Sequence, residues 1–277
     1  MNSWIETYRG AASPWECDVT EHFTMAFYFD RIAMAEATLA AELGLLDMLR
    51  QGGFGWRCNV RLARELRSGS AFHIESGIIG TGDGPHFGHR VVNSATGEPT
   101  TWFDIHWDMS DARLRREPAA EWWDGPHFPE RSDPVDLAGL IPSMAGRVQP
   151  GDLDQFGRMG LAGMVHKFSD AAVQFGAAIG LTADYIKTGR RSFSAFELRV
   201  RIAHFPRLSE AYRIDTGLAH LGNTSLRYLH LMRDAATGEE IARVDRYGVQ
   251  LDLDARRPAP LAPALRAKAE RLLLPMQ

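Results

Sequence analysis

The chain has 277 residues, of which 45% are hydrophobic, and it carries a formal net charge of −4 at pH 7. This length and composition allow a sizeable core in one or two domains, and the lack of a large basic patch argues against nucleic acid as a partner. Cys17 and Cys58 are too few for a disulfide framework and no segment is apolar enough to span a membrane, so we expect a cytoplasmic protein.

The first informative stretch is SPWECDVTEHFTMAFYFD, residues 13–30, in which an acidic, histidine-bearing segment runs into an apolar one. Asp18 and His22 are side chains that can move protons, and they are equally typical of a turn and a helix cap. The apolar residues of AFYFDRIAMAEATLAAEL at 26–43 recur at helical spacing and end before Gly44. This pattern predicts a buried helix that begins directly after the loop.

The second half shows the same order of elements. LAGMVHKFSDAAVQFGAAI at 161–179 again has helical spacing and is again followed by a glycine, Gly180. FELRVRI at 196–202 alternates between apolar and polar residues, which indicates a strand with one face buried. Three further strand-like segments follow, separated by the turn sequences GNT and ATGEE. Each half is therefore predicted to hold a short strand, a loop, a buried helix and a long antiparallel meander.

The two halves also repeat one another in sequence. VRLARELRSGSAFHIESGI at 60–78 recurs as VRIAHFPRLSEAYRIDTGL at 200–218, with conservative exchanges at several of the positions that differ. The loop of the first half recurs as well: Pro14, Glu16 and Asp18 match Pro150, Asp152 and Asp154. Stretches that keep their order in this way predict a tandem duplication, packed as a pseudo-two-fold pair.

The repeat sets the expected domain organisation. Between the two copies, EPAAEWWDGPHFPERSDP breaks the periodicity with prolines and charges. A copy of about 120 residues is an ordinary domain size. We expect a first unit at 1–116, a linker at 117–145, a second unit at 146–260 and a helical C-terminal tail at 261–277.

The loop and the helix that follows it resemble the hot-dog-fold acyl-CoA thioesterases of the 4-hydroxybenzoyl-CoA thioesterase group. Their motif runs roughly D-x-x-G-H-x-N-N-x-x-Y and opens the central helix. The first copy has Asp18, Glu21, His22, Thr24, Met25 and Tyr28 at these places, and the second has Asp154, Gly157, Arg158, Gly160, Leu161 and Met164. Neither copy keeps the full motif.

The resemblance implies an α+β fold of two tandem hot-dog units, each a long central helix wrapped by a curved antiparallel sheet. It implies an acyl-CoA thioesterase in which a loop aspartate, Asp18 or Asp154, acts as general base or nucleophile. Backbone N–H groups at the start of the following helix would polarise the thioester carbonyl. CoA would enter as part of the substrate, and no cofactor or metal is expected. The pair His86 and His89 is interpreted as part of a loop rather than as a metal site.

Each candidate residue also has a plain structural interpretation. Both aspartates can be turn or cap residues. His22 can orient a carbonyl or water, or close the loop against the partner unit. Thr24 can bond substrate or backbone, and Arg158 can bind an anionic ligand group or pair with a nearby aspartate, Asp152 or Asp154, of which the ion pair is favoured.

A further group of candidates lies after the loop motifs. Tyr28 takes the place of the motif tyrosine and is a candidate for substrate binding. Arg61 and Arg201 recur at equivalent places, as do Arg67 and Arg207. In the resembled enzymes basic residues on the outer surface meet the CoA nucleotide, so these arginines are candidates for that contact. Arginines of this kind also simply keep the solvent face of a strand polar.

Two other functions compete with the thioesterase. In a hot-dog hydratase or dehydratase, four residues that include an Asn-Pro pair separate the Asp from the His. Here only three residues separate Asp18 from His22, and they include no Asn-Pro. A non-catalytic acyl-CoA or acyl-thioester binding protein would keep the fold and lose the motif. The expected partner is a small-molecule acyl-CoA, without nucleic acid or membrane, and a homo-oligomer is possible.

Overall fold

The computed structural model describes residues 4–18, 21–80, 84–109, 123–129 and 131–276. The chain divides into two compact units that do not follow a single cut in the sequence. The first comprises Met1–Phe128, Gln149–Val165 and Arg201–Leu208, and the second comprises Pro129–Val148, His166–Val200 and Ser209–Gln277. Below, "first repeat" denotes the elements between residues 5 and 108 and "second repeat" those between residues 141 and 270. The unit boundaries expected from the sequence, 1–116 and 146–260, stay predictions.

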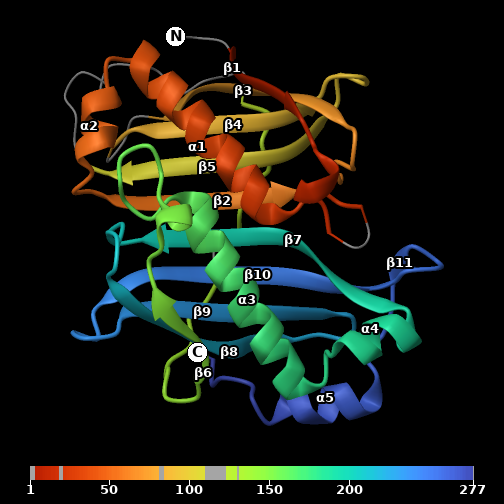
Figure 1. Ribbon diagram of the computed structural model, residues 1–277. Coiled ribbons are helices and arrows are strands. Elements are labelled where there is room, and N and C mark those ends of the chain that lie inside the picture. The colour runs from red at the N-terminus through yellow and green to blue at the C-terminus, as the bar shows by residue number, and fades with distance from the viewer. Residues whose placement is uncertain (1–3, 19–20, 81–83, 110–122, 130, 277) are drawn as a thin grey trace. The chain divides into compact units, whose positions relative to one another are not determined.

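The first repeat forms one long helix and an antiparallel sheet in the order β1-β3-β4-β5-β2. Figure 1 shows α1 lying across one face of this sheet, and its range agrees with the helix predicted at 26–43. The elements are β1 (Ile5–Ala11), a 3-10 turn (Pro14–Glu16), α1 (Met25–Glu42), α2 (Leu46–Gln51), β2 (Gly55–Leu62), β3 (Ala71–Gly80), β4 (His86–Asn93) and β5 (Pro99–Asp108).

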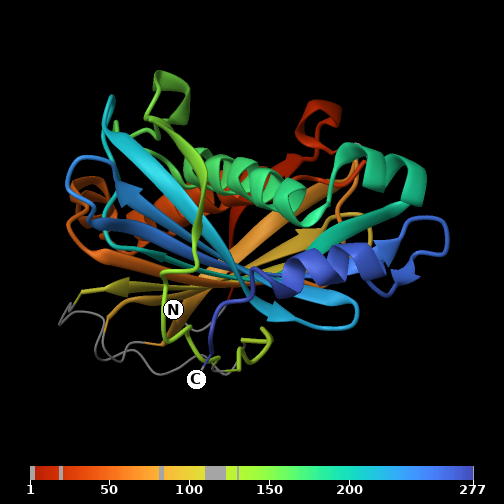
Figure 2. The same cartoon turned by 90° about the horizontal axis from the view of Figure 1, so that it is seen from below.

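The second repeat forms the same arrangement, with strands in the order β7-β10-β9-β8-β6. The predicted helix at 161–179 is α3, and Figure 2 shows it on one side of its strands. The elements are β6 (Ile141–Arg147), a 3-10 turn (Pro150–Asp152), α3 (Leu161–Ile179), α4 (Ala183–Gly189), β7 (Arg191–Ile202), β8 (Ala211–Leu221), β9 (Ser225–Asp234), β10 (Glu240–Asp252), β11 (Arg257–Pro258) and α5 (Pro263–Glu270). The expected helix of the tail is α5.

The meander differs from the prediction at one connection in each repeat. The strand after the helix does not pair with the next strand in sequence but with the last: β2 pairs with β5, and β7 neighbours β10. The connection from β2 to β3 does not form a hairpin turn; it hydrogen-bonds to the helix-entry loop. Phe23 N donates to Leu66 O at 2.9 Å, and Ser68 N donates to Glu21 O at 3.1 Å. These bonds satisfy the backbone of the connection without a tight hairpin.

The two helix-entry loops repeat one another in backbone conformation. Each begins with a 3-10 turn whose third residue, Glu16 or Asp152, accepts a hydrogen bond from the backbone N–H three residues earlier. The motif position normally held by glycine has a positive φ in both copies, 64° at Glu21 and 75° at Gly157. Such a φ costs glycine little and strains other residues. The first copy has therefore kept the loop shape while losing the residue that suits it.

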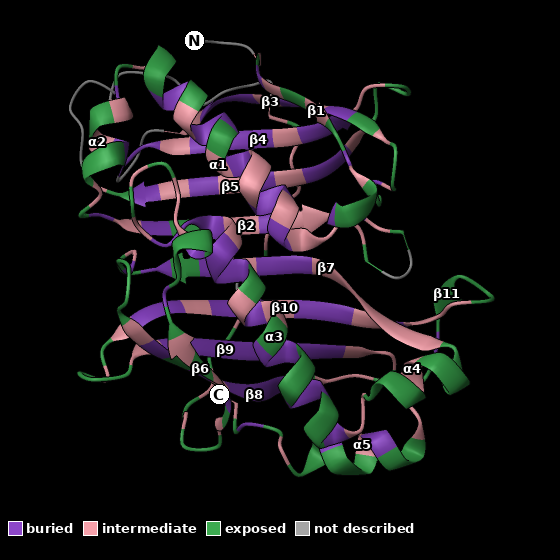
Figure 3. Ribbon diagram, in the orientation of Figure 1, coloured by how far each residue is buried: buried purple, intermediate pink, exposed green. Residues whose placement is uncertain are grey.

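Each repeat has an apolar interior between helix and sheet, and Figure 3 shows buried positions along α1, α3 and the strands. One side chain breaks the predicted alternation of β7. Glu197 was expected on a solvent-facing side of the strand, but it is 0% exposed and binds the guanidinium of Arg131 at 3.1 Å. A segment that the sequence assigns to the linker thus covers this face of the second repeat. Within the described residues, no helix is long and apolar enough to cross a membrane.

Candidate active site

The first loop holds Asp18 in an exposed turn. Asp18 N donates to His22 O and Glu21 N donates to Asp18 O, both at 2.9 Å, and His22 N donates to Asp18 Oδ1 at 3.2 Å. Asp18 thus combines the structural role of a turn residue with a carboxylate that remains accessible.

His22 is held by the connection that follows β2. Its Nε2 lies 2.8 Å from Glu65 Oε2 and 3.3 Å from Arg67 Nη2. These contacts lie within the first repeat and fix the ring beside the Asp18 turn. The polar group next to Asp18 is therefore a histidine with a carboxylate partner, an arrangement that fixes the orientation of an imidazole.

Thr24 is the N-cap residue of α1, and it does not cap the helix with its side chain. Its Oγ1 is buried and finds no hydrogen-bond partner among the described residues. The commoner alternative for this hydroxyl, a bond to the backbone, is therefore not what the structure shows. In the second copy Gly160 takes this place, and a Cβ there would lie 3.1 Å from Asp154 Cβ. The start of α1 thus offers a buried hydroxyl that the start of α3 lacks.

The second loop holds Asp154 in an ion pair. Its Oδ1 accepts from Phe156 N at 2.8 Å and from Arg158 N at 3.3 Å, and its Oδ2 accepts from Arg158 Nε at 3.1 Å. The favoured interpretation of Arg158 as an ion-pair partner is confirmed, with Asp154 as the acceptor. The Arg158 guanidinium also lies over the ring of Phe205, 4.4 Å from its centre. Both oxygens of this aspartate are thus occupied by protein donors.

The interior of the first repeat is filled by a buried carboxyl between two indoles. Trp56 Nε1 and Trp107 Nε1 both donate to Glu36 Oε1, at 2.9 and 2.6 Å. Burial raises the pKa of Glu36, and the two indole bonds and the charge of Arg158 only partly oppose this. Trp107 is fully buried and belongs to the core of this repeat. This part of the first repeat is packed solid with large side chains.

The remaining candidates lie away from the loop turns. Tyr28 is 3% exposed, its hydroxyl accepts from Leu66 N at 3.2 Å, and burial raises its pKa to about 12. Arg61 on β2 is half-buried with its guanidinium 5.9 Å from the ring centre of Phe128, and Arg201 on β7 is exposed. Their expected contacts with substrate stay predictions.

The second repeat contains a cavity of about 280 Å³ between α3, α4 and the strands β7, β9 and β10. Most of its lining is apolar, and Val173, which is 70% exposed, lies on its wall, so the cavity reaches the surface along α3. Its lining includes Ala172, Val173, Gly176, Tyr228, Arg246 and Gly248. Sequence reasoning missed this cavity.

The signal for the cavity was present in the repeat. The inward-facing residues of β5 are Phe103, Ile105 and Trp107, all 0% exposed. Cross-strand pairing places Arg246 opposite Tyr228 as it places Ile105 opposite Phe87, so Arg246 corresponds to Ile105 and Gly248 to Trp107. Where the first repeat has a large indole, the second has no side chain at all. Aligning the two copies strand by strand exposes this difference.

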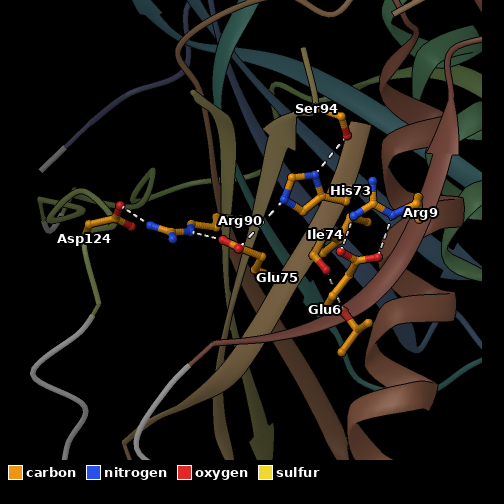
Figure 4. A network of polar contacts seen from close by, with 9 residues as sticks. Glu6, Arg9, His73, Ile74, Glu75, Arg90, Ser94 and Asp124 are labelled. Atoms are coloured by element: carbon orange, nitrogen blue, oxygen red, sulfur yellow. Dashed lines mark hydrogen bonds and ion pairs between the residues drawn. The ribbon is translucent and has the colours of Figure 1, made fainter. Parts of the chain in front are cut away.

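The other polar clusters mostly pair internally, although His89 Nε2 is buried with no partner among the described residues. His86 and His89 lie on β4, so their interpretation as part of a loop was wrong. His86 pairs with Asp104 at 2.6 Å and His89 bonds Ser76 at 2.6 Å, and the described residues hold no group of side chains that could bind a metal ion. Figure 4 shows a network on the first sheet in which Arg90 bridges Glu75 and Asp124, at 2.6 Å each. These side chains pair with one another and form no site.

Comparison with known proteins bears on the second repeat directly. The sequence model of the Thioesterase-like superfamily matches residues 148–269, which include all the residues that line the cavity. The chain matches no curated protein sequence. The family match therefore falls on the repeat that holds the open interior.

Three solved structures resemble nearly the whole chain. A putative oleoyl thioesterase from Lactobacillus plantarum has 14% identity and a TM-score of 0.63, covering 90% of this chain and 96% of that one. An acyl-ACP thioesterase from Bacteroides thetaiotaomicron has 12% identity and a TM-score of 0.63, covering 87% and 96%. The 12:0-ACP thioesterase from Umbellularia californica has 14% identity and a TM-score of 0.58, covering 91% and 93%. At this identity the likeness establishes the fold.

The predicted α+β fold of two tandem hot-dog units is confirmed, because each repeat is a long helix on an antiparallel sheet and the structural likeness extends over both. The expected class, thioester hydrolases, agrees with the family match. The chain has a double hot-dog fold, and its residues 148–269 match the sequence model of the Thioesterase-like superfamily.

Proposed function

We propose that the chain hydrolyses an acyl thioester whose acyl group occupies the cavity of the second repeat. The observation that carries this proposal is the cavity itself, an apolar space beside α3 within the residues that match the thioesterase family. Its volume of about 280 Å³ is near the lower end of small-molecule pockets, about 300 Å³. A short or medium acyl chain fits such a space better than a long one.

The chemistry needs a base or nucleophile and a group that stabilises the oxyanion. In the general-base route, water attacks the acyl carbon while the aspartate takes its proton, the C–S bond breaks, and the thiolate is protonated as it leaves. The start of α1 supplies N–H groups of the kind that favour an oxyanion, together with the Thr24 hydroxyl, which has no hydrogen-bond partner in the described part of the chain. These features support the first loop as the catalytic one.

The two aspartates differ in exposure to solvent. Asp154 is half-buried, and its two carboxylate oxygens accept two backbone N–H bonds and a bond from the Arg158 guanidinium. Asp18 is exposed, and His22, held by Glu65, stands next to it. We therefore assign the base or nucleophile to Asp18 and a structural role to Asp154.

The thiol carrier is proposed to be coenzyme A. Two of the similar structures bear the names of thioesterases for acyl groups on an acyl carrier protein, so that carrier is the second candidate. Both carriers present the same phosphopantetheine thiol, and the cavity would receive the same acyl chain from either. The exposed Arg201 and half-buried Arg61 remain candidates for the phosphates of a nucleotide carrier.

A non-catalytic acyl-thioester binding protein is the alternative function. It is favoured by one observation, the loss of the motif glycine at Glu21 in the copy that keeps Asp and His. In such a protein the acyl group would bind in the cavity, and the loop residues would have no catalytic role. The hydratase alternative has no such support, because neither loop has the Asp–His spacing of that group.

The test is thiol release from purified full-length protein with acetyl-, butyryl-, hexanoyl- and decanoyl-CoA, and with the same acyl groups on acyl carrier protein. Asp18→Asn and Asp154→Asn are measured in parallel. We expect turnover that peaks at an intermediate chain length and depends on Asp18. Binding of the esters without any thiol release would overturn the proposal in favour of the non-catalytic alternative.

A further inference from the structure

Arg246 points into the cavity of the second repeat from the middle of β10. Residues alternate between the two faces of a strand, so Arg246 shares its face with Gly248, which also lines the cavity. Its neighbour Asp245 lies on the opposite face, where it accepts from Arg227 Nε at 2.7 Å. The guanidinium therefore belongs to the cavity and not to the outer face of the sheet.

The surroundings of Arg246 hold no described counter-charge. Among the described residues that line the cavity, Arg246 is the only charged one and none is acidic. Burial lowers the pKa of its guanidinium, and the neighbouring Tyr228 opposes this only in part. Arg227 on the neighbouring strand shows the usual solution, because it is 3% exposed and paired with Asp245. Arg246 is half-buried, and a cation held against an apolar lining without a described partner is costly, so that such groups mark functional sites.

The corresponding position of the first repeat confirms that the fold does not require this charge. Ile105 takes that position on β5 and is 0% exposed. An aliphatic side chain thus suffices where the interior is filled. The arginine occurs in the repeat whose interior is open.

We infer that the acyl group accepted by this cavity carries an anionic group, in the first place a terminal carboxylate, which binds the guanidinium of Arg246. The inference rests on the proposed function and names its substrate class, the thioesters of dicarboxylic acids. A carboxylate can accept two parallel hydrogen bonds from a guanidinium, which makes this pair strong and directional. The apolar lining then holds the methylene chain between the carboxylate and the thioester.

The anion has a second source, because the phosphates of the carrier are also anionic. A phosphate at Arg246 would affect all acyl groups on one carrier equally. A carboxylate at Arg246 would affect only those acyl groups that bear one. The comparison of two substrates on the same carrier therefore separates the two sources.

The experiment compares adipoyl-CoA with hexanoyl-CoA, which have the same chain length and differ in the terminal carboxylate. The variants are Arg246→Met, which removes the charge, and Arg246→Lys, which keeps it. Arg243→Met is the matched control, because Arg243 lies on the same strand but on the other face and pairs with Glu240 at 2.9 Å. Circular dichroism and thermal melting establish that each variant is folded.

We expect wild-type protein to prefer adipoyl-CoA in kcat/KM. Arg246→Met should reduce this preference roughly 10- to 100-fold, as expected for a lost hydrogen bond to a charged group. Arg246→Lys should retain part of it, and Arg243→Met all of it. An equal preference for both esters in wild type, or a loss by Arg246→Met that is the same for both, would overturn the inference.

A binding arm keeps this inference distinct from the proposed function. Calorimetry with free adipate and with hexan-1-ol, which has the same chain length and no carboxylate, needs no turnover. Adipate binding that is lost in Arg246→Met supports the inference even if no thioester is hydrolysed, whereas turnover of hexanoyl-CoA without adipate binding supports the function and contradicts the inference.

Discussion

The two repeats have the same arrangement of helix and strands, and they differ in what fills the interior. In the first, Glu36 and the indoles of Trp56 and Trp107 occupy the space beside α1. In the second, Gly248 stands where Trp107 stands in the first, and a cavity of about 280 Å³ lies beside α3. The duplication thus leaves a packed interior in one copy and an open, candidate binding interior in the other. The helix-entry loops have also diverged. The aspartate of the first loop is accessible, and the aspartate of the second loop is held in an ion pair.

The largest expected effect concerns the two loop aspartates. Asp18→Asn removes the proposed base and should lower kcat roughly 10²- to 10⁴-fold, the range of a lost general base. Asp154→Asn removes an ion pair instead and should leave kcat within a few-fold of wild type while lowering the melting temperature. Steady-state thiol release and thermal melting measure both. The reverse assignment of effects would place catalysis in the second loop.

The filled interior of the first repeat predicts a stability effect. Glu36→Ala leaves two buried indole N–H groups without their acceptor and opens a void, which should cost about 3 kcal/mol in the free energy of unfolding. Glu36→Gln keeps a carbonyl acceptor and should cost less. Urea unfolding gives both values, and kcat should change little in either folded variant. A large loss of kcat with unchanged stability would contradict a structural role.

Filling the open interior is the converse experiment. Ala172→Phe places a ring in the cavity and excludes three or four methylenes of an acyl chain, each worth about 0.8 kcal/mol, so kcat/KM for hexanoyl-CoA should fall roughly 100-fold. Acetyl-CoA, which hardly enters the cavity, is the internal control and should be affected much less. Equal effects on both esters, with the fold intact, would mean that the chain binds elsewhere.

The smallest effect tests a feature that the two repeats share. His89 and His230 are fully buried, and burial lowers the pKa of each from 6.5 to about 3. Because the unfolded chain binds the proton first, each histidine stabilises the fold above pH 6.5 and loses this contribution as the pH falls toward 3. Between pH 7 and pH 5 the loss is about 2 kcal/mol for each histidine.

The measurement is urea unfolding at pH 7 and pH 5 of wild type, His89→Gln and His230→Gln. Each variant should lose about 2 kcal/mol less on acidification than wild type does. Glu36 contributes with the opposite sign, because its raised pKa makes stability fall as the pH rises above 4.5, so the difference between proteins is the quantity to compare. Equal losses in all three proteins would contradict neutral, buried histidines.

Much of the fold could be predicted from the sequence because it depends on local patterns. The helical spacing at 26–43 and 161–179 and the alternation in the strands identified α1, α3 and the sheet of each repeat. The pairing of β2 with β5 was not predicted, because it depends on backbone bonds between a connection and a distant loop. The burial of Glu197 was not predicted for a similar reason, since it depends on Arg131 from another part of the chain.

The candidate site could be predicted only in part. The loop motif pointed to Asp18, His22 and Asp154, but the partners that distinguish the two aspartates became visible only in the structure. The cavity depends on side chains that are small or absent, and a single glycine such as Gly248 carries no signal of its own. It became informative only beside Trp107 at the same place in the other repeat.

The most direct test of the account is a crystal structure with hexyl-CoA, a thioether that cannot be hydrolysed. The account predicts the hexyl chain in the second repeat, against Ala172 and Gly248, with the first repeat still closed by Trp107. A hexyl chain in the first repeat, with Trp107 displaced, would contradict the division of roles between the two copies.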